Sequence, residues 1–81
     1  MEVPEEVVER IVNKISEELK ISKEIVRGVA KIIVKTEVWR FPIICAFARA
    51  RCIASIRLLV KLRWCTIAAL CEELPLLPPT E

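Results

Sequence analysis

The chain of 81 residues contains no His, Asp, Gln or Tyr, and only one Gly and one Asn. Without His and Asp, a serine-type triad, a carboxylate–histidine metal site and an EF-hand loop are excluded. Candidate nucleophiles such as Cys52 and Cys65 have no partner to activate them. We therefore expect no catalytic residue, no metal site, no cofactor and no small-molecule substrate.

The rest of the composition fits a small helical protein with a modest positive charge. Apolar residues make up 54% of the chain, mean hydropathy is +0.45 and the net charge is +2. The chain has few Asn and Gln residues and many Glu, Lys, Arg, Ile and Val residues, a composition that is typical of hyperthermophile proteins. This points to an archaeal or viral origin, although an engineered sequence would share the same bias. The acidic opening Met-Glu-Val-Pro-Glu-Glu does not resemble a signal peptide. We expect a cytoplasmic location or one within a virion.

Apolar residues recur at helical spacing and no segment alternates with period two, which predicts an all-α fold. A first helix is expected over residues 4–20, with an apolar stripe of Val7, Val8, Ile11, Val12, Ile15 and Leu19. A second, capped by Ser22, is expected over residues 23–38, with an apolar side of Ile25, Val29, Ile32, Ile33 and Thr36. The prediction is a bundle of three or four helices over residues 1–74, followed by an extended proline-rich tail over 75–81.

Composition changes near residue 38. All four Cys, both Trp and both Phe follow it, and no acidic residue lies between Glu37 and Glu72. A long, very apolar helix is expected from about Ile43 to Leu74, either continuous or divided into a pair by a break around residues 61–64. A helix that is apolar all round is central in its fold or is covered by a partner.

We therefore expect a homo-oligomer, a folded protein partner, or a break that lets the second half of this stretch pack on the first. The candidate interface residues are Ile44, Ala48, Cys52, Ile56, Leu59, Leu76 and Leu77. A transmembrane span is not expected, because charged side chains interrupt every window of about 20 residues. These charges are Arg49, Arg51, Arg57, Lys61 and Arg63.

The four cysteines fit no standard metal motif. Cys45 and Cys52 would lie about 10 Å apart along one helix, beyond disulfide reach, and Cys65 and Cys71 are separated similarly. A disulfide must therefore cross between the two halves of the stretch, which requires a helix break or a second chain. We expect free thiols packed in the core, with disulfides as the alternative.

A basic stripe marks the second expected helix. Its members are four residues apart and therefore share one face: Lys23, Arg27, Lys31 and Lys35. Such a row can follow a phosphate backbone, although a solvated helix face is the simpler interpretation. Further along the chain, Arg57, Lys61 and Arg63 are expected to assist. Trp39 and Trp64 are expected to pack against the boundary turns, with base stacking as the alternative.

One segment resembles a known family. Leu19-Lys20-Ile21-Ser22-Lys23, with Ile25 and Ala30-Lys31-Ile32, is similar to the first helix junction of a cyclin-like repeat in the archaeal transcription factor B family. Later matches to the third and fourth helices of that repeat are Ala50, Ala54-Ser55, Arg57-Leu58-Leu59, Arg63, Thr66 and Ile67-Ala68. The chain differs from the family pattern in several ways. The loop between the second and third helices is shortened to residues 37–42, and Arg49 and Arg51 stand where the family has small residues. A fifth helix, a second repeat and a zinc ribbon are missing. The resemblance implies a helical module that touches DNA or another transcription protein through its basic face.

The leading hypothesis is thus a non-enzymatic helical module that binds nucleic acid or a transcription-type protein complex. The first alternative is a self-assembling structural protein, such as a virion or filament subunit. The second alternative is a helical protein that is active at membrane surfaces.

Overall fold

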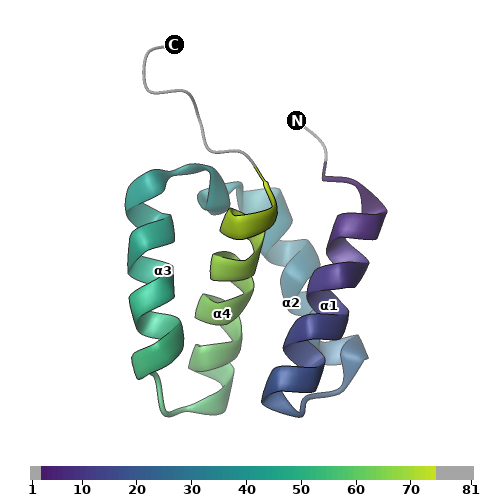
Figure 1. Ribbon diagram of the computed structural model, residues 1–81. Coiled ribbons are helices and arrows are strands. Elements are labelled where there is room, and N and C mark those ends of the chain that lie inside the picture. The colour runs from purple at the N-terminus through teal and green to yellow at the C-terminus, as the bar shows by residue number, and fades with distance from the viewer. Residues whose placement is uncertain (1–2, 75–81) are drawn as a thin grey trace.

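The computed structural model describes residues 3–74, and these residues form helices and turns without a strand. The elements are α1 (Glu5–Leu19), α2 (Lys23–Thr36), the short 3-10 helix η1 (Val38–Arg40), α3 (Pro42–Ala54) and α4 (Leu58–Glu73). The expected all-α bundle is confirmed, with four α-helices (Figure 1). The proposed tail over 75–81, with Leu76 and Leu77, lies outside the described residues.

Local signals in the sequence define α1 and the start of α2. The hydroxyl oxygen of Ser22 accepts a hydrogen bond from the Ile25 amide at 3.4 Å, which confirms Ser22 as the N-cap of α2. Lys20 ends α1 in the left-handed conformation, with a φ of 58°. The expected stripe of α1 is buried from Val7 to Ile15, while Leu19 is half-buried. Helical periodicity was sufficient to identify this face because all its large apolar residues lie on one side.

The predicted apolar side of α2 was wrong in part: Ile33 is buried and Val29 packs half-buried against the core, as expected, but the other three residues are exposed. The structure buries Val26, Ala30 and Ile33, whereas Ile25 and Ile32 are 51% and 66% exposed. The buried set has the i, i+4, i+7 spacing of a helical stripe, but α2 carries apolar residues on two adjacent sides. The contacts of α2 with α1, α4 and η1 decide which of the two sides faces inward.

The apolar second half forms two helices, and the break lies at residues 55–57 rather than at 61–64. Ser55 and Arg57 have extended backbone, with ψ angles of 134° and 129°. The turn contains neither Gly nor Pro, so local sequence gives little warning of it. Because the chain folds back at this turn, the inner side of α3 packs on α4. Of the three outcomes expected for this stretch, the structure therefore shows the third, a break that lets the second half pack on the first.

Helix α4 lies between α3 and the α1–α2 pair (Figure 1). Its buried residues face several directions, which agrees with this central place. By contrast, within residues 3–74 α3 packs only against α4 and η1, and it buries no more than Cys45 and Ala48. Within the described part of the chain, none of the helices combines the length and apolarity that a transmembrane span requires.

All four cysteines form disulfides, so the expectation of free core thiols was wrong and the alternative holds. Cys45 pairs with Cys71, and Cys52 pairs with Cys65. Both bonds join α3 to α4. They therefore cross between the two halves of the apolar stretch, as predicted for any disulfide in this chain. The small inner face of α3 brings the two helices close enough for this, with Cα–Cα separations of 5.9 and 4.6 Å.

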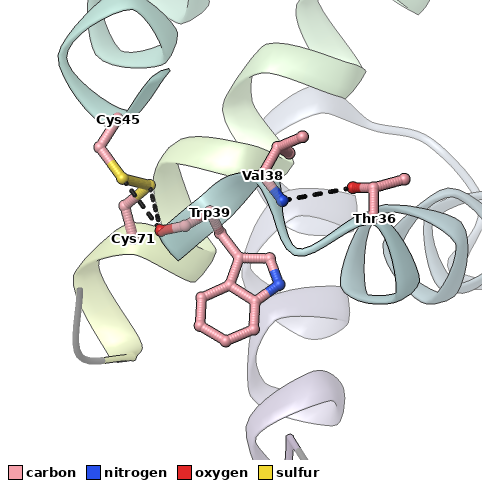
Figure 2. The surroundings of a disulfide bond; sticks show 5 residues. All are labelled: Thr36, Val38, Trp39, Cys45 and Cys71. Carbon is pink, nitrogen blue, oxygen red and sulfur yellow. Dashed lines mark hydrogen bonds between the residues drawn. A yellow bond between two sulfur atoms is a disulfide. The ribbon is translucent and has the colours of Figure 1, made fainter. Parts of the chain in front are cut away.

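Trp39 fills the space beside the first of these disulfides. Figure 2 shows its carbonyl oxygen facing both sulfur atoms, at 3.2 Å from Cys45 and 3.5 Å from Cys71, while the indole ring points away from them. These are close contacts, because disulfide sulfurs carry no hydrogen to donate. The side chain is fully buried, and its Nε1 donates to the Val34 carbonyl at 3.4 Å. Trp39 therefore packs in the core at the α2–α3 boundary, as expected.

Removing either disulfide should lower the free energy of unfolding. Loops of 26 and 13 residues are closed by Cys45–Cys71 and Cys52–Cys65. The loop-entropy relation gives about 3.5 and about 3 kcal/mol for such closures. Paired Cys→Ala substitutions at each bond, compared by guanidinium unfolding of the oxidised proteins, test this expectation. An unchanged free energy in either pair would contradict it.

Thr66 offers a second test of the core. It is fully buried in α4, and its hydroxyl has no hydrogen-bond partner among the described residues. An unpaired buried polar group costs about 1–3 kcal/mol. Thr66→Val keeps the shape, removes the hydroxyl and should raise the free energy of unfolding by about 1 kcal/mol. Thr66→Ser keeps the hydroxyl and loses a methyl group, so it should be destabilising; the reverse order would refute the assignment.

Candidate nucleic-acid interface

The basic stripe of α2 is interrupted by an ion pair. The Arg27 guanidinium donates two hydrogen bonds to the Glu9 carboxylate of α1, at 2.8 and 2.9 Å. This two-point geometry is the strong form of an Arg–carboxylate contact. The remaining members, Lys23, Lys31 and Lys35, are exposed. Three cations of the stripe are thus open to a partner, while Arg27 helps to join α1 to α2.

The ion pair shifts the protonation equilibria of both groups. The hydrogen bond from Arg27 lowers the pKa of Glu9 below its ordinary value of 4.5, against a smaller opposing effect of desolvation, and the positive charges of Arg27, Lys31 and Lys23 assist. The same bond raises the pKa of Arg27. Glu9 therefore places a negative charge within the basic stripe at neutral pH, a feature that the spacing of the lysines alone does not show.

The three cations predicted on the later segment have different surroundings. The Lys61 ammonium donates to the backbone carbonyl of Cys52, near the end of α3. A cation there satisfies a free carbonyl and complements the negative end of the helix dipole, so Lys61 serves the fold. Arg57, at the N-cap of α4, and Arg63, within α4, are both exposed. Six of the seven predicted residues thus lie on two helices, α2 and α4, and Arg57 lies just before α4.

A second group of residues forms a more compact site. The Arg51 guanidinium carbon lies over the Phe47 ring, 4.9 Å from its centroid. The Phe47 and Trp64 rings meet edge to face, with centroids 5.4 Å apart. Trp64 in turn lines a hollow of about 270 Å³ together with Arg63 and Ile67. We call Phe47, Arg51, Arg63 and Trp64 the arginine–aromatic cluster.

A second hollow extends the cluster along α4. It measures about 420 Å³ and is lined by Arg57, Leu58, Leu59, Val60 and Arg63. Arg63 therefore borders both hollows, with Trp64 on one side and Arg57 on the other. The two hollows therefore adjoin at Arg63 on α4.

The cluster has no acidic counterpart nearby in the sequence. The four ion pairs within residues 3–74 are Arg10–Glu73, Lys14–Glu72, Arg27–Glu9 and Arg40–Glu37. None of them includes Arg51, Arg57 or Arg63. These three guanidiniums are therefore available to an anionic ligand, and a guanidinium can bind phosphate through two hydrogen bonds.

Two members of the cluster, Phe47 and Arg51, were not predicted from the sequence. Phe47 and Arg51 are four residues apart on α3, a spacing that places two side chains on the same face and could have indicated the pair. Their position beside Trp64 could not be foreseen, because it depends on the break at 55–57 that returns α4 alongside α3. Base stacking was kept as an alternative for Trp64, which is half-buried.

The candidate interface residues are distributed over different environments. Ala48 is fully buried within the chain, and Cys52 is held in its disulfide with Cys65. Ile44 is half-buried. Ile56 and Leu59 are 95% and 67% exposed, so they are accessible to a partner. The last two candidates, Leu76 and Leu77, are outside the described residues.

Comparison with known proteins gives no match: no family model, no curated protein and no solved structure is similar to this chain at a significant level. The similarity to a cyclin-like repeat stays a sequence-based prediction.

The Glu9–Arg27 pair should make stability depend on pH. A carboxyl group with a lowered folded pKa contributes stability that is present above its ordinary value of 4.5 and is lost as the pH falls through the folded value. The gap in unfolding free energy between wild type and Glu9→Gln should therefore shrink below that pH. Arg27→Gln should behave in the same way. A gap that stays constant down to about pH 3 would show that the pair does not stabilise the fold.

Proposed function

We propose that this chain is a non-enzymatic helical module that binds single-stranded nucleic acid through the arginine–aromatic cluster. One observation carries the proposal: Trp64 lines an open hollow beside Arg63, and the Arg51–Phe47 pair extends the same surface. Proteins that bind single strands combine cationic grooves with aromatic side chains on which bases stack. A single strand is favoured over a duplex because only unpaired bases present their faces to an indole.

Each part of the cluster has a separate role in this proposal. Trp64 offers its ring to one base, a contact worth about 1–3 kcal/mol in proteins of this kind. Arg63 and Arg57 face the neighbouring hollow, where they bind backbone phosphates. Arg51 stacks on Phe47, which holds its guanidinium near the same strand. The similarity to a cyclin-like repeat supports the same class of partner.

The exposed lysines of α2 are a secondary contact in this proposal. Lys23, Lys31 and Lys35 lie apart from the cluster, on a helix that packs against α1 and α4. They contribute long-range attraction to a polyanion, without sequence preference and with strong dependence on salt. Their contribution is weakened by the Glu9 carboxylate within the stripe.

Fluorescence of the full oxidised chain tests the proposal. Titration with oligothymidylate at about 50 mM salt should quench Trp64, while Trp39 stays silent because it is fully buried. Trp64→Phe should abolish the quenching and weaken binding measured by anisotropy of a labelled oligonucleotide. Absence of binding by the wild type would refute the proposal.

The arginines are tested by the salt dependence of the same binding. Arg63→Gln and Arg51→Gln should each reduce the slope of log K against log salt by about 0.7, the value for one phosphate contact on a single strand. Arg10→Gln is the matched control, because it removes the same charge from a residue paired with Glu73 outside the cluster. An equal loss in the control would mean that net charge, rather than the cluster, governs binding.

A further inference from the structure

Helix α3 is apolar on two opposite sides. Its inner side, with Cys45, Ala48 and Cys52, faces α4. The other side is exposed, and we call it the outer face of α3: Ile43, Ala46, Phe47, Ala50, Ile53 and Ala54. Ile43 and Ile53 are 81% and 82% exposed, among the highest values for large apolar residues in the part of the chain that the structure describes. A helix of a monomer in water normally has polar residues on that side.

Two arginines border this outer face. Successive residues of an α-helix are about 100° apart, so Arg49 and Arg51 lie on either side of Ala50, which is at the centre of the face. Both side chains are exposed. No acidic residue occurs between Glu37 and Glu72, so every charged residue on α3 is an arginine. Ile56, in the turn that follows α3, is 95% exposed and adds a further apolar side chain at this end of the helix.

The composition of this surface limits the kind of partner that it fits. Nucleic acid offers phosphates to the arginines but leaves Ile43 and Ile53 in water. A second copy docked through the same face would bury the isoleucines but would bring arginines against arginines without a counter-charge. An anionic lipid bilayer satisfies both requirements, because its headgroups bind guanidinium and its acyl chains receive the apolar side chains.

We propose that the outer face of α3 docks on the surface of anionic bilayers, with the helix lying parallel to the membrane plane. Ile43, Ile53 and Ile56 enter the boundary between headgroups and acyl chains. Arg49 and Arg51 stay at the level of the lipid phosphates. This inference shares Phe47 and Arg51 with the arginine–aromatic cluster but uses neither Trp64 nor Arg63, and it does not require that nucleic acid binds.

Vesicle flotation with the full oxidised chain tests the docking. Vesicles of phosphatidylcholine with about 30% phosphatidylglycerol should carry the protein, whereas pure phosphatidylcholine vesicles should leave it in solution. Arg49→Gln should weaken binding to the anionic vesicles about fivefold, the contribution of one cation near such a surface. Equal binding to both kinds of vesicle would overturn the proposal, because charge would then have no part in docking.

The apolar component has a matched control in the same chain. Ile43→Ser with Ile53→Ser should weaken vesicle binding by at least about tenfold and should leave oligothymidylate binding unchanged. Ile25→Ser with Ile32→Ser makes the same chemical change at two exposed isoleucines of α2 and should retain vesicle binding. Equal losses in the two double variants would overturn the assignment to α3.

Sedimentation without lipid completes the test. A monomeric wild type supports an unoccupied outer face that is open to a membrane. A wild-type dimer that Ile43→Ser with Ile53→Ser converts to a monomer would instead identify a second copy as the occupant, and would overturn the lipid proposal. Circular dichroism of each variant verifies that the helices are intact before binding is compared.

Discussion

Two disulfides tie α3 to α4 and thereby fix the position of a helix that buries little of its own surface. Helix α3 buries only Cys45 and Ala48 and packs against nothing in residues 3–74 except α4 and η1. Such small side chains provide little hydrophobic stabilisation. The two disulfides supply what burial does not, and they hold α3 in one register on α4. That register places Phe47 beside Trp64 and fixes which side of α3 faces outward.

Charge is distributed unevenly between the two halves of the bundle, and this difference underlies both proposed surfaces. In the first half, glutamates lie among the cations, so Arg27 of the basic stripe is paired with Glu9. The second half has no acid between Glu37 and Glu72, so Arg49, Arg51, Arg57 and Arg63 stay without carboxylate partners among the described residues. An anionic partner therefore meets the α3–α4 side at lower electrostatic cost than the α1–α2 side.

Features that depend on residues close together in the chain were predicted from the sequence, whereas features that depend on residues far apart in the chain were not. The N-cap at Ser22 and the buried stripe of α1 depend on residues within one or two turns, and both were predicted. The buried side of α2, the break at 55–57 and the disulfide pairing depend on neighbours distant in the chain, and each differs from the leading expectation. The candidate site divides in the same way: the lysine stripe was visible from spacing, whereas the arginine–aromatic cluster was not.

The amino-acid sequence was sufficient to establish the helical class, most helix boundaries, the absence of acidic residues between Glu37 and Glu72, and the rule that any disulfide must cross a helix break or join two chains. These features follow from periodicity, capping and composition, which are local or additive. Three features depended on the three-dimensional structure: Lys61 binds a carbonyl of α3, Trp64 lines a hollow, and one apolar side of α3 is exposed among the described residues. Each of these depends on which surfaces meet when α4 folds back on α3, because burial is a property of contacts between segments.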